Sequence, residues 1–129
     1  MLINLSNHSL ETWSEQQKQE AEKQFGSIMD LQFPPIAPES DLEQIAQIAA
    51  EYVDICFKEF ERENPSSIQN AVHVMGEMTF VYQFVKMMSE LGVLCVASTT
   101  RRIVVAEEQN EKISKFEFVK FRPYCLEFF

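Results

Sequence analysis

Residues 71–79 read Ala-Val-His-Val-Met-Gly-Glu-Met-Thr, a short apolar run that ends in a glycine turn and leads into a helix. An apolar run of this length, bounded by turn signals, is typical of a buried strand. The helix that follows, expected over residues 78–91, is apolar on nearly all sides. We therefore expect it to pack against more than one layer, either inside the monomer or against a second subunit.

Working outward from this unit, strands and helices alternate along the whole chain. We expect strands at residues 2–6, 27–31, 71–75 and 93–97, and helices at residues 14–25, 40–63 and 78–91. Capping-box patterns begin the first two helices, at Ser14 with Gln17 and at Ser40 with Glu43. A stiff extended connection is expected at residues 33–38, which contain three of the five prolines, and a break at residues 64–67.

The C-terminal part is expected to end the sheet with an antiparallel pair. The two strands are residues 103–106 and 115–121, around a polar loop at residues 107–114. This order of elements predicts an α/β fold, a Rossmann-like three-layer sandwich with a mainly parallel sheet and a C-terminal antiparallel β-hairpin.

The composition fits one globular domain. The chain has 129 residues, of which 46% are apolar, with eleven Phe and only three Gly. A domain of this size hides roughly two-thirds of the surface that its unfolded chain exposes, so a hydrophobic core can support it alone. We expect residues 1–129 to form a single domain.

The net charge of -9 opposes broad binding to DNA or RNA, because such binding depends on Lys and Arg that displace counterions. A small anionic ligand held by a few groups is still allowed. Much of the positive charge lies in the last third of the chain, at Arg101, Arg102, Lys112, Lys115, Lys120 and Arg122. Any anion site should therefore use this C-terminal part.

The cysteines and the N-terminal sequence favour a soluble cytoplasmic protein. Cys56, Cys95 and Cys125 are odd in number and far apart, so they support neither a disulfide framework nor a C-x-x-C metal site. The N-terminus lacks a basic leader before a long apolar stretch, and no window approaches the roughly 20 apolar residues of a membrane span. We expect no membrane partner.

Polar residues directly follow three of the expected parallel strands. The sets are Asn7 with His8, residues 76–79, and residues 98–102. Because the carboxyl ends of parallel strands meet at one edge of a sheet, we expect the three sets to lie together. That edge is where open α/β sheets bind ligands.

The two histidines have different sequence contexts. His8 follows a strand, where it can donate to a phosphate or act as a general acid near neutral pH. The alternative is that Asn7 and His8 only shape the loop and cap the next helix. His73 lies inside a buried-strand pattern, so we expect a hydrogen-bonded core histidine rather than a ligand.

The turn Gly76-Glu77-Met78-Thr79 opens a helix, where glycine allows close backbone approach and the first N–H groups point toward a bound anion. Glu77 has two interpretations. It is either an acidic residue stabilised by the helix dipole, by about 0.3–1 kcal/mol, or a general base or an acceptor for ribose hydroxyls. A single glycine matches neither a P-loop nor G-x-G-x-x-G.

Residues 98–102, Ser-Thr-Thr-Arg-Arg, offer three hydroxyls and two guanidinium groups, a composition suited to phosphate oxygens. A turn between strands also favours Ser and Thr, with the arginines as solvated charge. Because the chain is otherwise acidic, we favour an anion site. No Walker lysine, Ser-His-Asp order or metal-ligand cluster is present, so no metal or other cofactor is expected.

Three segments resemble the small CRISPR-associated Rossmann-like proteins of type III systems, the stand-alone CARF-like ring nucleases. They are Asn-Leu-Ser-Asn-His at residues 4–8, Val-His-Val-Met-Gly-Glu-Met-Thr at residues 72–79 and Cys-Val-Ala-Ser-Thr-Thr-Arg-Arg at residues 95–102. In that family, as here, an N-terminal strand ends in a polar loop, a G-[DE]-x-[TG] turn opens a helix, and a T-T-x-R segment follows the fourth strand.

The resemblance implies a homodimer that binds a cyclic oligoadenylate, such as cyclic tetra-adenylate, across its two-fold axis and cleaves it without a metal. In that reaction a ribose 2′-hydroxyl attacks the adjacent phosphate and leaves a 2′,3′-cyclic phosphate, which switches off antiviral signalling. Carried onto this chain, it implies His8 and Glu77 as acid and base and Arg102 as the group that stabilises phosphate charge.

The resemblance also implies a ligand-binding set around these groups. The set is Asn7, Gly76, Met78, Thr79, Ser98, Thr99, Thr100 and Arg101, of which Arg101 falls at the variable position of T-T-x-R. Some relatives bind the ring without cutting it, which leaves a noncatalytic sensor or sink as an alternative. The residues alone also allow a domain that binds another nucleotide or an ordinary metabolite, or a subunit of a larger complex.

Overall fold

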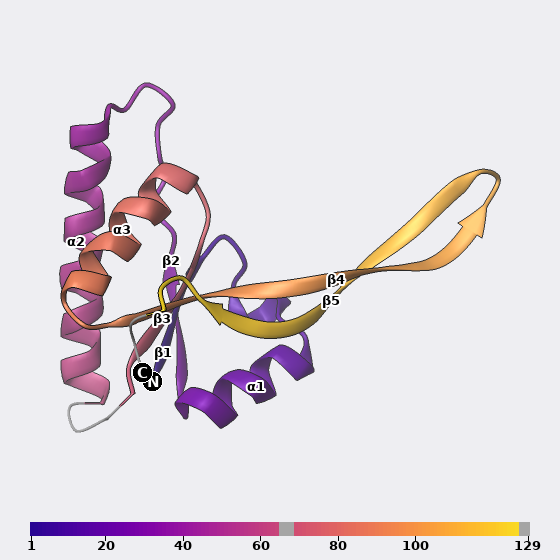
Figure 1. Ribbon diagram of the computed structural model, residues 1–129, viewed down its shortest axis with the longest axis horizontal. Coiled ribbons are helices and arrows are strands. Elements are labelled where there is room, and N and C mark those ends of the chain that lie inside the picture. Colours follow the sequence, from indigo (N-terminus) through magenta and orange to yellow (C-terminus); the bar gives the residue numbers. More distant parts are fainter. Residues whose placement is uncertain (65–68, 127–129) are drawn as a thin grey trace.

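The computed structural model describes residues 1–64 and 69–126. The strands in these residues are β1 (Leu2–Ser6), β2 (Ile28–Gln32), β3 (Ala71–Met75), β4 (Leu94–Glu108) and β5 (Glu111–Pro123), shown in Figure 1. The helices are α1 (Glu15–Phe25), α2 (Leu42–Glu63) and α3 (Met78–Glu90), with a short 3-10 helix, η1, at Leu10–Thr12. The predicted break at residues 64–67 lies outside the described residues, apart from Asn64.

The described strands form one sheet in the order β2-β1-β3-β4-β5. β1 pairs in parallel with both β2 and β3, so that Asn4 lies opposite Asp30 on one side and His73 on the other. β3 pairs in parallel with β4, and β5 returns antiparallel to β4. This confirms the mainly parallel sheet with a C-terminal antiparallel hairpin.

Helices cover both faces of the sheet. Because neighbouring residues of a strand point to opposite faces, each strand serves two cores. Ile3 and Val72 belong to the core beneath α2 and α3, whereas Leu2 and Ala71 belong to the core beneath α1. The result is the Rossmann-like three-layer α/β sandwich that the sequence predicted (Figure 1).

The start of α1 is confirmed, but the predicted capping box of α2 is wrong. The box at Ser40 and Glu43 is replaced by one at the next position: Asp41 accepts a hydrogen bond from the Gln44 N–H (3.0 Å), and the Gln44 side chain accepts one from the Asp41 N–H (2.9 Å). Both pairs fit the same sequence pattern. The Ser40 N–H bonds to the Ala37 carbonyl in a turn, so the helix begins one residue later than predicted.

The last two strands are longer than predicted. The polar loop expected at residues 107–114 is wrong, because only Gln109 and Asn110 connect β4 to β5, with φ angles of +49° and +69°. Two positive φ angles in a two-residue connection are typical of a type I′ hairpin turn. Residues 98–102, expected after a strand, lie inside β4. The polar residues that suggested a loop belong to an exposed two-stranded ribbon (Figure 1).

Helix α3 packs against the sheet and α2, but one side of it is left uncovered by the part of the chain that the structure describes. Its buried residues include Phe80 and Phe84, whereas Met78 and Tyr82 are exposed over 84% and 64% of their surfaces. The expectation of burial on more than one layer is therefore met on part of the helix only. None of the helices in the described residues is long and apolar enough to span a membrane.

The position of the α2 cap can be tested by mutation. Asp41→Ala removes the acceptor of the Gln44 N–H and should lower the free energy of unfolding by about 1 kcal/mol. Ser40→Ala is the matched control and should change it by less than about 0.5 kcal/mol, because its side chain caps no helix. Urea unfolding of both variants measures the difference; an equal loss in the two would contradict the assignment.

Candidate functional site

The candidate site lies at the carboxyl ends of β1 and β3. In the strand order 2-1-3-4, the topological switch point falls between these two strands, and ligands bind outside their carboxyl ends. Ser6 is paired with Met75, so the residues that follow them, Asn7 and Gly76, emerge side by side. The structure therefore brings together the first two of the three predicted polar sets.

The loop after β1 is fixed through its backbone. The His8 carbonyl accepts hydrogen bonds from Asn4 Nδ2 (2.8 Å), Ser6 Oγ (3.1 Å) and Trp13 Nε1 (3.2 Å). The side chains of His8 and its neighbour Asn7 remain exposed. The backbone of His8 thus shapes the loop, as one interpretation expected, while its imidazole faces outward from a well-anchored position.

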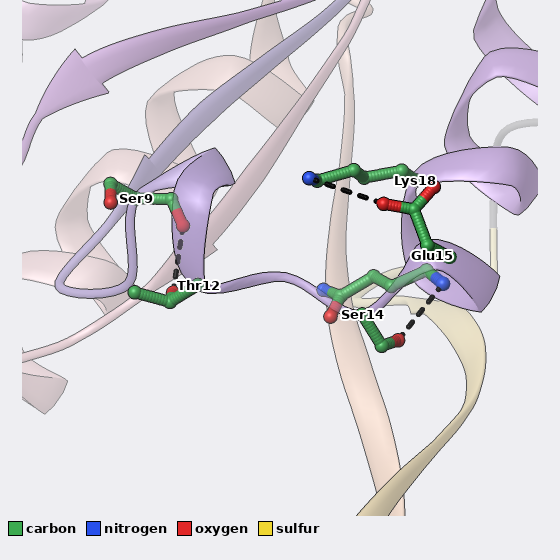
Figure 2. Close-up of polar contacts among 6 residues, drawn as sticks. Ser9, Thr12, Ser14, Glu15 and Lys18 are labelled. Carbon is green, nitrogen blue, oxygen red and sulfur yellow. Dashed lines mark hydrogen bonds and ion pairs between the residues drawn. The ribbon is translucent and has the colours of Figure 1, made fainter.

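Figure 2 shows how this loop leads into α1. Thr12 Oγ1 donates to the Ser9 carbonyl (2.7 Å), and the Ser14 hydroxyl accepts from the Gln17 N–H (3.2 Å). An exposed ion pair between Lys18 and Glu15 (3.6 Å) lies on the first turn of the helix. The cap of α1 is therefore Ser14, and neither Asn7 nor His8 caps it.

A chain of polar side chains, buried at its two central members and exposed at Asp30, crosses four strands beneath the loop. Asn4 Nδ2 donates to Asp30 Oδ1 (2.9 Å), Asn4 Oδ1 lies 2.9 Å from His73 Nδ1, and His73 Nε2 lies 3.1 Å from Ser98 Oγ. Asn4 and His73 are only 1% and 2% exposed. We call these four residues, Asp30, Asn4, His73 and Ser98, the polar ladder.

The partners in the polar ladder determine the proton positions on His73. Because Asn4 Oδ1 can only accept, His73 Nδ1 carries the hydrogen, and Nε2 is left to accept the Ser98 hydroxyl. Burial and, to a smaller extent, the nearby His8 together lower the pKa of His73 to about 4. His73 is therefore the neutral, hydrogen-bonded core histidine that its sequence context predicted.

Aromatic rings close the polar ladder from the side of α1. The ring centroids of Trp13 and Phe121 lie 5.1 and 5.7 Å from that of His73, both in edge-on arrangements. This enclosure is why His73 cannot easily accept a proton. Of the two histidines, the exposed one is therefore the candidate for proton transfer to a ligand.

The sequence predicted that Gly76 allows close approach of another group, and that group is a side chain of the same chain. A Cβ atom at this position would overlap the ring of Phe33, which packs edge-to-face on Phe80 with a centroid distance of 5.0 Å. The absence of a side chain at Gly76 is thus explained by core packing. Its backbone still turns at the switch point, beside the loop that carries His8.

The carboxylate of Glu77 caps α3 itself. It accepts hydrogen bonds from the Phe80 N–H (2.9 Å), the Thr79 N–H (3.1 Å) and the Thr79 hydroxyl (2.7 Å). The bonds from the Thr79 hydroxyl and from the Phe80 N–H lower the pKa of Glu77. Glu77 therefore fills the helix N-terminus that was expected to face an anion, as the dipole interpretation predicted.

Of the third predicted set, residues 98–102, only Ser98 lies at the site. Ser98 Oγ lies 3.1 Å from His73 Nε2 and 3.2 Å from Met75 Sδ, at the end of β3. Arg102 instead donates from Nε to Ser114 Oγ (2.9 Å) on β5. A strand rises about 3.3 Å per residue, so Arg102 lies roughly 13 Å further along β4 than Ser98. Arg101 and Arg102 do not meet the Gly76 turn of their own chain.

Thr99 and Thr100 lie at the start of this continuation of β4. Thr99 Oγ1 donates to the Lys120 carbonyl (3.2 Å), and the ladder between β4 and β5 shifts its register between Thr99 and Thr100. Thr100 is exposed, opposite Phe118. These hydroxyls therefore line the base of the ribbon next to the site, between the polar ladder and the two arginines.

Hollows border the carboxyl edge on several sides. One of 350 Å³ is lined by Ser6, Asn7 and Phe33, and one of 490 Å³ by Glu77 and Thr79 with residues of the connection before α2. A third, of 670 Å³, runs along α3 from the Gly76 turn and is largely apolar. We call it the α3 groove; its lining includes Gly76, Met78, Tyr82, Val85, Tyr124 and Cys125.

The sequence patterns did not point to Asn4, which contacts His73, or to Asp30, which contacts Asn4. Each is a polar residue at the centre of an otherwise apolar strand run, as His73 is. That shared position was a usable signal, because three such residues in adjacent strands can meet only at the same register. Among the residues that the structure describes, no three His, Cys, Asp or Glu side chains gather where they could hold a metal ion.

The buried His73 should make the stability of the protein depend on pH. Its folded-state pKa, about 4, lies below the ordinary value of 6.5, so the unfolded chain binds the proton more readily between these values. The free energy of unfolding should therefore fall as the pH is lowered through this window, by on the order of 3 kcal/mol at pH 4.

Urea unfolding between pH 7.5 and pH 4 measures this effect. His73→Gln should lose most of the added pH dependence, whereas His8→Gln, a change at an exposed imidazole, should keep it. Parallel pH curves for wild type and His73→Gln would contradict the prediction.

Comparison with known proteins gives a family for the chain. No curated protein and no solved structure matches it. Residues 1–122 match the family described as Uncharacterized protein MJ1673 family. The matched range contains the loop with His8, the polar ladder, the Gly76 turn and nearly all of β5. The chain belongs to the MJ1673 family.

Proposed function

We propose that the protein binds a cyclic oligoadenylate, such as cyclic tetra-adenylate, at the carboxyl edge of β1 and β3 and cleaves it without a metal ion. The observation that supports this most is the exposed imidazole of His8, held on an anchored loop beside the Gly76 turn at the switch point of the sheet. Nucleotides bind at this point in doubly wound sheets. The hollows of 350 and 490 Å³ offer room near it.

The proposed reaction uses the ligand's own nucleophile. A ribose 2′-oxygen attacks the adjacent phosphorus, the bond from phosphorus to the 5′-oxygen breaks, and the ring opens to a 2′,3′-cyclic phosphate and a 5′-hydroxyl. A base takes the proton of the 2′-hydroxyl, and an acid gives one to the leaving oxygen. His8 supplies the exposed imidazole for this transfer, because the other imidazole, His73, is buried and neutral.

The residues around Gly76 are suited to the remaining parts of the ligand. Met78 exposes an apolar surface next to the turn, on which an adenine ring can pack. Glu77 is held ionised by Thr79 and Phe80, so its role is that of an acceptor for ribose hydroxyls rather than a strong base. The exposed hydroxyl of Thr100 provides a donor on the adjacent strand, whereas the hydroxyls of Ser98 and Thr99 already donate to His73 Nε2 and to the Lys120 carbonyl.

A second candidate is a noncatalytic sensor or sink for the same ring. It is favoured by two contacts: Glu77 is engaged with the N-terminus of α3, and Arg102 is bonded to Ser114 away from the edge. In both proposals the protein works in the cytoplasm, where the free thiols of Cys56, Cys95 and Cys125 stay reduced. The two candidates differ only in turnover.

Incubation of the purified protein with cyclic tri-, tetra- and hexa-adenylate tests the enzymatic proposal. In the presence of EDTA, we expect linear products that end in a 2′,3′-cyclic phosphate, at a rate that EDTA does not lower. Chromatography separates the products. Intact rings of every size together with tight binding would favour the noncatalytic protein, and intact rings with no thermal shift would exclude both candidates.

The role of His8 is tested by His8→Gln. The substitution keeps the backbone carbonyl that anchors the loop, so the fold should be retained. Loss of a general acid or base typically lowers the rate by about 10²–10⁴-fold, and we expect a loss in this range with little change in ligand affinity. Lys23→Gln, on the exposed face of α1, serves as the control. Unchanged turnover in His8→Gln would contradict the assignment.

A further inference from the structure

The outer parts of β4 and β5 form a two-stranded arm, residues 99–120, that extends away from the three layers (Figure 1). Along its length the two strands pair with each other, from Thr100 opposite Phe118 to Glu108 opposite Glu111. A two-stranded hairpin alone in water is marginally stable at best. An arm of this length therefore needs a surface to pack on.

One face of the arm carries an apolar row that starts in the core. Phe118 is 5% exposed and packs in the core beneath α1, whereas Phe116 and Val104 are 68% and 53% exposed. Alternate residues of a strand, and residues directly opposite each other, share a face. The pairs Arg102 with Phe116 and Val104 with Ser114 therefore continue the face of Phe118 into solvent.

The arm and the rest of the chain have opposite charges. Residues 99–120 contain five Lys and Arg against four Glu, a net charge of +1. The remaining residues contain six Lys and Arg against sixteen Asp and Glu, a net charge of -10, which together with the arm gives the total of -9. The arm of one copy is thus electrostatically attracted to the body of another.

The α3 groove is a second apolar surface, and none of residues 1–64 and 69–126 covers it. Its volume is 670 Å³, and the exposed side chains of Met78 and Tyr82 lie on it. The charged residues Lys86 and Glu90 border it near the end of α3, and the Gly76 turn forms its other end. The groove therefore leads directly to the candidate site.

We propose that two copies of the chain exchange arms, so that the arm of each copy lies in the α3 groove of the other with Phe116 inserted. Each copy then supplies one arm and one groove, and the two equal contacts close a two-fold dimer. The exchange covers both exposed apolar surfaces and brings the basic arm onto the acidic body. The dimer itself does not depend on the proposed function.

The exchange also gives Arg102 a role that it cannot have in its own subunit. Arg102 lies opposite Phe116 on the same face of the arm, so it enters the partner's groove, which ends at the partner's Gly76 turn. The guanidinium is then available to the phosphates of a ligand bound there. This second step rests on the proposed function.

Molar mass in solution tests the exchange first. Light scattering after gel filtration should give twice 15.0 kDa for the wild type. Phe116→Glu and, on the groove side, Tyr82→Glu should each give a monomer with unchanged circular dichroism. Ile113→Glu, on the opposite face of the arm and also exposed, should remain a dimer. A monomeric wild type, or dimers of both Phe116→Glu and Tyr82→Glu, would overturn the proposal.

A cross-link tests where the arm lies. In Phe116→Cys, mild oxidation should join the introduced thiol to Cys125 in the groove of the other copy, as peptide mapping would show, and Cys125→Ser should abolish that link. A dimer whose introduced thiols join only to each other would overturn the groove assignment.

Complementation tests Arg102 separately from the dimer. Arg102→Ala and His8→Gln should each be inactive, but a randomised mixture should recover about a quarter of wild-type turnover, because half of the dimers then contain one intact composite site. No recovery, with wild type active and dimeric, would overturn the role in the partner's site. Inactive but dimeric wild type would overturn the proposed function and leave the exchange standing.

Discussion

The side chain of Asn4 makes four hydrogen bonds in the middle of the sheet, and the other features of the site depend on them. Its amide nitrogen donates to Asp30 and to the His8 carbonyl, and its oxygen accepts from Ser6 and His73. Each bond lost here leaves a buried polar group unsatisfied, at a cost of about 1–3 kcal/mol. Asn4 therefore holds β2, β1 and β3 in one register and ties the loop after β1 to that register.

This constraint gives the two histidines of the chain different surroundings. His73 is enclosed by Trp13 and Phe121, its Nδ1 hydrogen is committed to Asn4, and its Nε2 receives the Ser98 hydroxyl. His8 is anchored through its backbone carbonyl, so the bonds that fix the loop do not use its imidazole. Positive charge on His8 also disfavours protonation of His73, which adds to the lowering of the His73 pKa that burial causes.

Sequence reasoning located the layers and the carboxyl edge, because both follow from hydrophobic periodicity and from turn residues. The sequence-based prediction was wrong where two interpretations of the same local pattern fitted equally well. The patterns Ser40-x-x-Glu43 and Asp41-x-x-Gln44 fit a capping box equally well. In the structure Ser40 belongs to a turn with Ala37, and Asp41 caps the helix. The polar composition of residues 107–114 fits a solvated loop and an exposed ribbon equally well, and the Gln109-Asn110 turn lacks the glycine that signals a hairpin. The members of the polar ladder lie on four strands, so they could be matched only once the order of the strands was known.

The continuity of β4 links the buried constraint to the arm. Ser98 ends the polar ladder, and the same strand runs on without interruption to Glu108, so the direction in which the arm leaves the body is set where Ser98 meets His73. A loop at residues 98–102 would have let Arg101 and Arg102 fold back onto their own Gly76 turn. A paired strand cannot do so, because its backbone groups are committed to β5. The arginines that the sequence placed beside the site are therefore carried outward, and in the proposed exchange of arms it is the surface of the other copy on which their charge can meet a phosphate.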